Sequence, residues 1–365
     1  MIAPRIAVPD GARTAVGVHA AVATRGVELA IDVPPGTVTA VVGPNGSGKT
    51  TLLHLVAGLV APSAGTVRID DATVAGGSVH VPIHRRRVAL LTQRPSLFPH
   101  LDVLANVMFG PLAGGASRAA ARARALTELD AVGCGAFVDR RPVQLSGGQA
   151  QRVAIARALA TDPKVILLDE PLAGLDVAVG AEVRHTLAAR LRGRTALLVT
   201  HEPLDIWTIA DRVAVLDAGR LEAEGPAQEL LTRPTTGFLA RLSGTNLLAG
   251  RADGADALEL APGFLLRGLP DPDSPLTPDA PALASVAPAA ISLHRAEPGG
   301  SPRNVLPATV VSVEPRGQVV RVHLDLCGHS VSADLTPQSV AELGLAPGLP
   351  VRAAIKATQV RLYGR

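Results

Sequence analysis

The chain has 365 residues, a formal net charge of +3, and a composition that is 47% hydrophobic and only 2% aromatic. A chain of this length exceeds what one hydrophobic core usually organises, so two or three domains are expected. Its apolar runs are broken by charge or proline before the ~20 residues that a membrane-spanning helix needs. The scarcity of aromatic side chains for base stacking argues against a nucleic-acid partner. The composition therefore favours a globular chain of several domains that does not cross a membrane.

Residues 1–15 lack the basic segment, apolar core and small-residue cleavage site of a secretory signal, so a cytoplasmic location is expected. Cys134 and Cys327 lie far apart and belong to no CxxC motif, which predicts two unpaired thiols. Lysine is rare, so a lysine inside a motif, such as Lys49, carries weight. The basic run His84–Arg87 precedes a strand-like segment and is interpreted as a solvated loop.

The first strong motif follows the β-branched run Val38–Val42, which has the composition of a buried parallel strand. A glycine-rich turn and a helical pattern come next, and Gly58 followed by Pro62 marks the end of that helix. Strand, glycine-rich turn and helix in this order are the context of a phosphate-binding P-loop. Backbone N–H groups would close round the phosphates, while Lys49 reaches the terminal ones and Thr50 binds Mg²⁺. The predicted ATP-binding residues here are Gly43, Pro44, Asn45, Gly46, Ser47, Gly48, Lys49, Thr50 and Thr51.

Short apolar runs alternate with helical stretches further along, which predicts an α/β core with a parallel sheet. The expected strands are Val88–Leu91, Val165–Leu168, Ala196–Val199 and Val213–Leu216, and one expected helix is Val183–Leu191. Between Gln93 and Gln144 the pattern is helical, notably over Ser117–Leu129, and shows no clear strand. We therefore predict a helical subdomain, about residues 94–155, inserted in the α/β core.

Two acidic residues, Asp169 and Glu170, follow the apolar run Val165–Leu168 at the end of an expected strand. With a P-loop upstream, Asp169 is placed to hold Mg²⁺ and Glu170 to act as the base for an attacking water. The pentapeptide Leu145–Gln149 opens an alanine-rich helical stretch, so its unpaired backbone N–H groups form a second anion site. The sequence therefore predicts two anion sites in a nucleotide-hydrolysing chain.

The order of these motifs resembles the ATPase subunit of ABC (ATP-binding cassette) transporters over roughly residues 15–240. The matching segments, in chain order, are GPNGSGKT, Gln93, LSGGQ, LLDEP, Gly174-Leu175-Asp176 and His201. The resemblance implies a RecA-like P-loop fold, ATP and Mg²⁺ as cofactors, and ATP hydrolysis as the activity. It also implies that Gln93 contacts Mg²⁺ in the ATP site and senses a membrane partner. By the same resemblance His201 is catalytic and contacts the γ-phosphate, and Asp176 belongs to the D-loop.

The resemblance further implies a homodimer. In the family, the signature pentapeptide of each copy caps the γ-phosphate held by the P-loop of the other copy, and hydrolysis releases the dimer. The signature residues are Leu145, Ser146, Gly147, Gly148 and Gln149. Because the chain is not expected to span a membrane, this cycle is expected to drive separate integral membrane permease subunits.

One departure from the family concerns adenine. Family members usually stack the base on an aromatic residue upstream of the P-loop, but Phe98 is the first aromatic residue of this chain. Such stacking is typically worth ~1–3 kcal/mol. Adenine is therefore expected to be held by aliphatic contacts near Arg25–Val27, or by the partner subunit.

The composition changes after residue 245. Residues 246–299 are rich in Pro, Gly, Ala and Asp and are predicted to form a linker, with short strands possible at 257–266 and 287–293. From Val305 onward, alternating apolar runs separated by turn residues predict a small β-barrel of about sixty residues. One helical insert is expected in it, at Pro337–Leu343.

Two motifs of the tail, Ser301-Pro-Arg-Asn and Ile355-Lys-Ala-Thr, resemble the Mop type of TOBE domain, an OB-like barrel, over residues 300–362. The resemblance implies molybdate or tungstate as a ligand, and hydroxyl, cationic and backbone N–H groups suit a tetrahedral oxyanion. The candidate ligands are Ser301, Arg303, Asn304, Lys356, Ala357 and Thr358. The alternative is that the barrel only holds the ATPase dimer together.

The predicted organisation is thus an ATPase domain at 1–245, a linker or the start of a regulatory region at 246–299, and an oxyanion-binding domain at 300–365. The predicted function is ATP-driven import of molybdate or tungstate at the cytoplasmic face of the bacterial cell membrane. An extracytoplasmic oxyanion-binding protein is an expected indirect partner, and nucleic acid is not expected. One alternative is an importer of sulfate, a sugar or another solute with a purely structural tail. Another is a soluble ABC ATPase outside transport.

Overall fold

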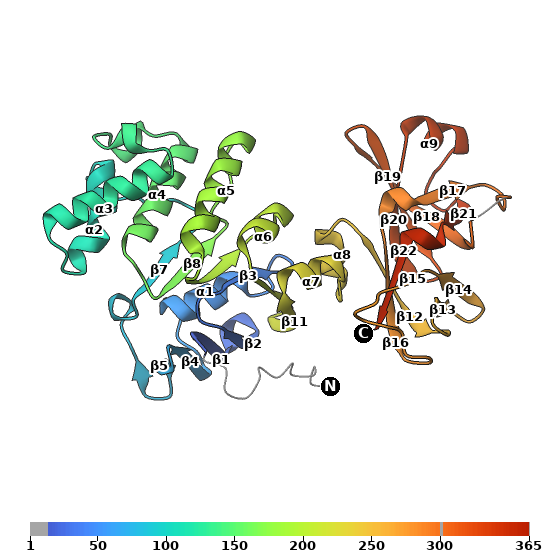
Figure 1. The fold of residues 1–365 in the computed structure, drawn as a ribbon, viewed down its shortest axis with the longest axis horizontal. Helices are drawn as coiled ribbons and strands as arrows, with labels where there is room; N and C mark the ends of the chain where they lie inside the picture. The colour runs from blue at the N-terminus through green and yellow to red at the C-terminus, as the bar shows by residue number, and fades with distance from the viewer. Residues whose placement is uncertain (1–13, 300–301, 365) are drawn as a thin grey trace. The chain divides into compact units, whose positions relative to one another are not determined.

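The structure is a computed structural model that describes residues 14–299 and 302–364 (Figure 1). The chain divides into two compact units, Met1–Gln228 and Glu229–Arg365. Each unit encloses buried apolar clusters of its own. No helix within the described ranges is both long enough and apolar enough to span a membrane.

A six-stranded sheet forms the centre of the first unit, in the order β11-β10-β3-β9-β8-β7. Its strands are β3 (Val38–Val42), β7 (Val88–Leu91), β8 (Val165–Asp169), β9 (Thr195–Val199), β10 (Arg212–Asp217) and β11 (Arg220–Pro226). All neighbouring strands are parallel except β10 and β11. Every residue of β3 and β9 is buried, as expected for a parallel sheet covered on both faces. The predicted α/β core is confirmed.

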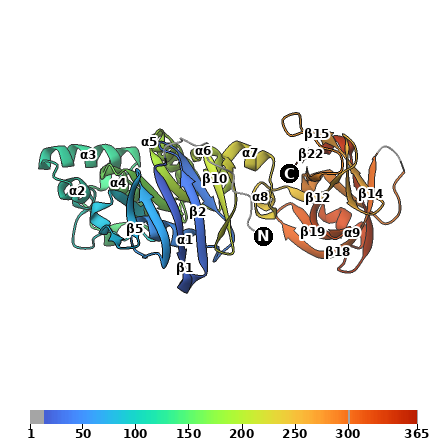
Figure 2. The same cartoon turned by 90° about the horizontal axis from the view of Figure 1, so that it is seen from below.

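Helix α1 (Lys49–Ala57) shares an apolar core with this sheet and with a second, antiparallel sheet in the order β2-β1-β4-β5-β6 (Figure 2). The strands of the second sheet are β1 (Val16–Val22), β2 (Val27–Val33), β4 (Ala64–Ile69), β5 (Ala72–Gly76) and β6 (Val79–His80). The helix ends at Gly58, whose φ of 88° lies in the left-handed region. The helix stop predicted at this glycine is confirmed, and burial from two sides fixes α1 beneath the P-loop.

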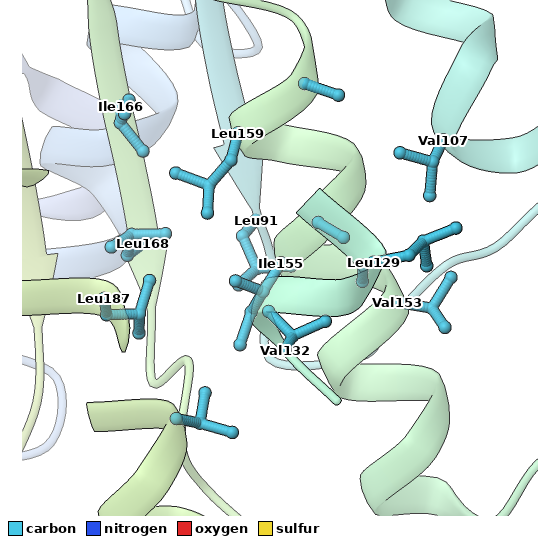
Figure 3. Close-up of a cluster of buried hydrophobic side chains, with 14 of the residues drawn as sticks. Leu91, Val107, Leu129, Val132, Val153, Ile155, Leu159, Ile166, Leu168 and Leu187 are labelled. Atoms are coloured by element: carbon cyan, nitrogen blue, oxygen red, sulfur yellow. The ribbon is translucent and has the colours of Figure 1, made fainter. Parts of the chain in front are cut away.

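Between β7 and β8 the described chain contains only helices and turns. The helices are α2 (Val103–Ala113), α3 (Arg118–Ala131) and α4 (Gly147–Ala160), and two more, α5 (Val177–Leu191) and α6 (Pro203–Ile209), follow β8 and β9. Figure 3 shows Ile155 and Leu159 of α4 among apolar side chains of both the sheet and the other helices. The helical pattern predicted between Gln93 and Gln144 is confirmed, and α4 joins this helical region to the α/β core.

Two sheets share one apolar core in the second unit. One has the order β14-β13-β12-β16-β22-β15, and the other, β17-β21-β18-β19-β20, is antiparallel and curled into a half-barrel. The strands of the C-terminal part are β18 (Asn304–Arg316), β19 (Val319–Leu326), β20 (His329–Leu335), β21 (Pro350–Ile355) and β22 (Val360–Gly364). Helices α7 (Ala227–Thr232) and α8 (Gly237–Leu242) precede the sheets, and α9 (Pro337–Leu343) has the predicted bounds. The predicted OB-like fold is confirmed.

The segment 246–299, predicted to be a linker or the start of a regulatory region, is not a linker, because strands occupy much of it, including those expected near 257–266 and 287–293. They are β12 (Asn246–Ala252), β13 (Ala257–Ala261), β14 (Phe264–Arg267), β15 (Leu269–Pro270), β16 (Pro281–Val286) and β17 (Ile291–His294). Ala284 of β16 pairs with Leu362 of β22, and Leu293 of β17 pairs with Ala353 of β21. A barrel of about sixty residues is therefore too small, since the C-terminal strands need these partners. Alanine and proline have low β propensity, which hid the strands.

The second unit contains a bidentate ion pair between facing residues of β19 and β20. Arg321 donates from Nε to Asp334 Oδ1 and from Nη2 to Oδ2, each at 2.8 Å. The hydrogen bonds from Arg321 lower the pKa of Asp334. A lowered carboxyl pKa stabilises the fold above the ordinary Asp value, and the stabilisation is lost as the pH falls through the lowered value.

We therefore expect Asp334→Asn to reduce the free energy of unfolding of the second unit by about 1 kcal/mol at pH 7. The difference from wild type should shrink as the pH falls through the lowered pKa of Asp334, because the wild-type carboxyl is then protonated and uncharged like the amide of the variant. Urea unfolding followed by the absorbance of Tyr363, the only tyrosine, measures it. Glu297→Gln, which alters an exposed carboxylate of the same unit, is the control. A difference that persists unchanged at low pH would contradict the assignment.

Candidate functional site

Three glycines shape the P-loop through backbone angles that favour glycine. Gly43, Gly46 and Gly48 have φ values of 148°, 81° and 102°. A Cβ on Gly43 would lie 2.0 Å from the carbonyl oxygen of Leu216, so no larger residue fits at the end of β3. Helix α1 begins directly after Gly48. Its first N–H groups and those of the loop form a concavity suited to an anion.

Lys49 and Ser47 indicate that the loop suits a phosphate. The ammonium of Lys49 donates to the carbonyl oxygens of Gly43 and Pro44, each at 2.8 Å, so it is folded over the loop. Ser47 is 2% exposed, and its hydroxyl has no hydrogen-bond partner in the part of the chain that the structure describes. Buried polar groups in native proteins almost always have a partner. A phosphate oxygen in the loop would supply one.

A hydroxyl and a carboxylate lie side by side where β8 ends. Thr50 Oγ1 donates a hydrogen bond of 3.3 Å to Asp169 Oδ2. Burial raises the pKa of Asp169, the hydrogen bond from Thr50 lowers it, and the charge of Glu170 raises it again. Burial also lowers the pKa of Lys49, against the charges of both carboxylates. Oxygen donors of this kind suit Mg²⁺, so the residues fit the metal that accompanies a nucleotide.

Gln93, Glu170 and His201 follow the carboxyl ends of β7, β8 and β9, and the structure brings them together. Gln93 Nε2 donates to Glu170 Oε2 at 3.0 Å, and His201 Nδ1 lies 3.2 Å from Glu170 Oε1. Glu170 has a φ of 49°, which is unusual for a residue other than glycine, and its N–H donates to Val199 at 2.9 Å. Carboxyl ends of parallel strands are the usual place for a ligand in an α/β sheet. The carboxylate of Glu170 is therefore held at the edge of the P-loop.

The signature pentapeptide forms the start of α4. Ser146 is the N-cap: its Oγ accepts from Gln149 N at 3.3 Å, and Gln149 Oε1 accepts from Ser146 N at 3.0 Å. This is a capping box, which the S-x-x-Q spacing would have predicted. Gly147 and Gly148 form the first turn after Leu145. Within the described ranges, no hydrogen bond or ion pair joins this pentapeptide to the P-loop or to Glu170.

Two further residues of the first unit, Asp176 and Arg25, bear on the predicted site. Asp176, predicted to belong to the D-loop, is exposed and is the N-cap residue of α5. Arg25, at the edge of the segment predicted to lie near adenine, donates from Nη1 to Thr51 Oγ1 at 3.2 Å. The hydrogen bond between Arg25 and Thr51 was not predicted. The sequence feature that could have indicated it is an arginine directly before Gly26 and β2.

Of the residues predicted to bind the oxyanion, Ser301 lies outside the described residues. The others divide into the buried Asn304 and a set near the surface. Asn304 is 1% exposed, and its amide bonds the backbone of Arg267 at 2.7 and 2.9 Å and the carbonyl of Ile355 at 3.2 Å. Asn304 is thus a structural bridge rather than a ligand, because both of its N–H donors are already used. This corrects the prediction that it binds an oxyanion.

Arg303 and Lys356 lie directly beside the buried pair Asn304 and Ile355, which face each other in β18 and β21. Both side chains are exposed, and neither forms an ion pair with another described residue. Ala357 and Thr358 follow in a 3-10 turn. Two unpaired cations and a turn with free N–H groups are therefore gathered at one end of the half-barrel.

Thr358 also lines a cavity of about 500 Å³ in the second unit. The cavity carries Arg233 and Arg361 but also Asp271, which is 5% exposed. Arg233 lies 2.9 Å from Asp271, and Arg361 lies 4.0 Å from the same carboxylate. These charges neutralise one another, so the cavity is less suited to an oxyanion than the end at Arg303 and Lys356.

The fold and the first site together define a P-loop nucleotide-binding protein. The family model described as ABC transporter matches residues 27–173, and that of the TOBE domain matches residues 300–362. The chain is 44% identical over 360 residues to the molybdenum import ATP-binding protein ModC of Mycobacterium tuberculosis (strain ATCC 25618 / H37Rv), covering 94% of this chain and 96% of the relative. It is 36% identical over 335 residues to ModC of Rhizobium etli, covering 88% and 92%.

Two solved structures are similar to part of the chain. One is cbiO1 of Clostridium perfringens, part of an ABC transporter complex, with a TM-score of 0.54, 29% identity, and coverage of 60% of this chain and 92% of that one. The other is the dimeric, post-hydrolysis ATP-binding cassette MJ0796 bound to ADP and Pi, with a TM-score of 0.50, 32% identity, and coverage of 55% and 89%. The chain belongs to the ATP-binding subunits of ABC transporters, with a C-terminal TOBE domain. The family resemblance predicted from the motifs is confirmed.

Proposed function

We propose that this chain is the ATP-hydrolysing subunit of an importer of molybdate or tungstate. The observation that supports molybdate or tungstate as the transported substrate is the share of the chain that is similar to each relative. The relatives named for molybdenum import match 94% and 88% of this chain. Relatives named for import of Fe(3+) ions in Rhodococcus jostii and of 2-aminoethylphosphonate in Salmonella typhimurium match 64% and 65% of it. Matches of 64% and 65% cannot cover both units in full, whereas matches of 94% and 88% must cover most of each.

The residues proposed to hold ATP and Mg²⁺ are the P-loop N–H groups with Lys49, Thr50 and Asp169, which converge at the ends of β3 and β8. The bound nucleotide and metal supply a phosphoryl group activated for transfer to water. Glu170 is proposed to accept the proton of that water, and His201 to contact the terminal phosphate. Gln93, which donates to Glu170, is proposed to link this carboxylate to a permease subunit.

We further propose that two copies act head to tail. Ser146 and the glycines after it form an exposed anion site that is not joined to the P-loop by any hydrogen bond between described residues. A second copy would bring this helix N-terminus to the nucleotide of the first. The dimeric state of the solved cassette bound to ADP and Pi supports the arrangement. Separate permease subunits would anchor the dimer at the cytoplasmic face of the membrane. An extracytoplasmic binding protein would be only an indirect partner, through those permease subunits.

The oxyanion is proposed to bind Arg303, Lys356 and the backbone N–H groups of Ala357 and Thr358. We expect the full-length chain to bind molybdate and tungstate in titration calorimetry, with sulfate as the competing anion. Lys356→Ala should weaken molybdate binding by about tenfold or more, because a charge-assisted hydrogen bond to the anion is lost.

Lys164→Ala is the matched control, since Lys164 is an exposed lysine of the first unit paired with Asp70. This variant should bind molybdate as the wild type does. If neither molybdate nor tungstate gave a binding signal in calorimetry, the C-terminal domain would have only a structural role. Equal affinity for sulfate would remove the argument for molybdate as the cargo. The full chain is required because residues 300–365 lack β17, which pairs with β21, and also lack β15 and β16, which pair with β22.

A further inference from the structure

Arg25 is a cation that reaches the P-loop helix from outside the P-loop. It ends a short 3-10 turn, Ala23–Arg25, that precedes β2. Its Nη1 donates a hydrogen bond of 3.2 Å to Thr51 Oγ1. Thr51 lies in the first turn of α1 and is 7% exposed. The guanidinium of Arg25 therefore stands at the N-terminal end of α1, beside the predicted phosphate site.

The backbone that carries Arg25 is held against the nucleotide loop. The N–H of Glu28 donates to the carbonyl oxygen of Gly219 at 2.8 Å. A Cβ on Gly48 would lie 3.2 Å from Cγ2 of Val27, so the P-loop and the start of β2 are in close contact. Both contacts are made by the protein itself and hold the backbone of this segment in place, which lowers the cost of ordering Arg25 on binding.

The protein does not neutralise the charge of Arg25. Across residues 14–299 and 302–364, no carboxylate forms an ion pair with it, whereas the nearby Arg220 pairs with Glu28 at 3.2 Å. The charge of Arg25 acts instead on His54, one turn further along α1, whose pKa is lowered first by burial and then by Arg25. An unpaired cation beside a helix N-terminus is an environment that stabilises an anion.

We propose that Arg25 binds a phosphate group of the nucleotide on the side of the P-loop where Thr51 lies. The inference rests on the proposed nucleotide site and adds a residue to it. Since Phe98 is the first phenylalanine, tyrosine or tryptophan of the chain, none of these residues lies upstream of the P-loop to stack on the base. Arg25 supplies affinity through the phosphates instead. The segment 25–27 therefore contacts the phosphates more than the base. As a consequence, the site distinguishes adenine from guanine only weakly.

Arg25→Gln tests the proposal in the full-length chain. We expect the Kd values of MgATP, MgADP and MgGTP to rise together by about tenfold, the effect of losing one charge-assisted hydrogen bond. Arg25→Lys should recover part of this loss because it restores the charge. The difference between Arg25→Gln and the wild type should shrink at 1 M salt, where exposed charges are screened within ~3 Å. Competition against a fluorescent nucleotide measures all of these values.

Arg220→Gln is the matched control, because Arg220 is an exposed arginine near the same segment that is already paired with Glu28. It should leave the Kd values unchanged, and all variants should unfold at the temperature of the wild type. Unchanged Kd values in Arg25→Gln would overturn the proposal. So would a loss that affects MgATP and MgADP but spares MgGTP, which would place Arg25 on the base. A wild-type chain that binds none of the three nucleotides would instead overturn the proposed nucleotide site, and that result does not involve Arg25.

Discussion

Glu170→Gln is expected to reduce ATP turnover by about 10²–10⁴-fold, the usual contribution of a positioned general base. The amide has the shape of the carboxylate but cannot accept a proton from water. It keeps the oxygen that Gln93 bonds at 3.0 Å, so the ends of β7 and β8 stay joined. MgATP binding should therefore stay close to that of the wild type. Single-turnover hydrolysis and a nucleotide-binding titration on the same preparation separate the two effects.

A second consequence of this variant concerns assembly. If hydrolysis releases the dimer, the Glu170→Gln chain should accumulate as a dimer in the presence of MgATP and return to monomer when the nucleotide is removed. Gel filtration with and without MgATP shows this directly. A variant that stays monomeric at saturating MgATP would contradict the proposed head-to-tail arrangement.

Glu202→Gln is the matched control for the base. The Glu202 carboxylate lies 3.8 Å from His201 Nε2, on the other side of the ring from Glu170, and is exposed. Removing its charge should change turnover less than threefold, since surface ion pairs of histidine contribute little. Equal losses in the two variants would show that the negative charge near His201 matters rather than a specific base. Rapid hydrolysis by Glu170→Gln would exclude Glu170 from that role.

The nucleotide site was predictable from the sequence because its parts are local. The P-loop combines a buried strand, glycines at left-handed angles and a helix start within Val38–Ala57, so composition and spacing specify it. The meeting of Gln93, Glu170 and His201 also follows from the sequence, since residues after neighbouring parallel strands share one edge of the sheet. The positive φ of Glu170 could not be predicted, because nothing but tertiary packing holds a glutamate there.

The second unit was less predictable because its pairings are long-range. Strand β16 meets β22 across a large sequence separation, and its buried face includes Ala282 and Ala284, which carry a weak strand signal. Asn304 was assigned to an oxyanion from its motif, but its amide is used to join β18 to the end of β14 and to β21. A polar side chain in a ligand-binding motif can thus have a structural role. Only its hydrogen-bond partners show whether it binds a ligand or stabilises the fold.

The basic run His84–Arg87 was interpreted as a solvated loop, and that interpretation fails at one residue. Arg86 is 3% exposed and donates to four carbonyl oxygens: Nε to Val81 at 2.9 Å, Nη1 to Leu55 and Val56 at 2.9 and 3.1 Å, and Nη2 to Val74 at 3.2 Å. Burial lowers its pKa. Two of the acceptors belong to the last turn of α1, where carbonyl groups lack helical partners and the helix dipole favours a cation.

Arg86→Met is therefore expected to reduce the free energy of unfolding of the first unit by about 3 kcal/mol or more, because several buried carbonyl groups lose their donor at once. Urea unfolding followed by the fluorescence of Trp207, the only tryptophan, reports on this unit. Arg86→Lys should recover little, since one ammonium cannot reproduce the planar set of guanidinium donors. A Cβ on Gly58 would lie 2.7 Å from the guanidinium, which leaves the site no room to rearrange around a bulkier group.

Arg85→Met provides the comparison that separates burial from charge. Arg85 is exposed and adjacent in sequence, so its loss removes the same formal charge from the same loop. We expect a change within about 0.5 kcal/mol, as for most surface substitutions. Equal destabilisation by the two variants would mean that the run acts through its net charge and that the four carbonyl contacts of Arg86 contribute nothing. A large effect of Arg86→Met alone would show that this arginine closes the carboxyl end of α1, the helix whose other end begins the phosphate site.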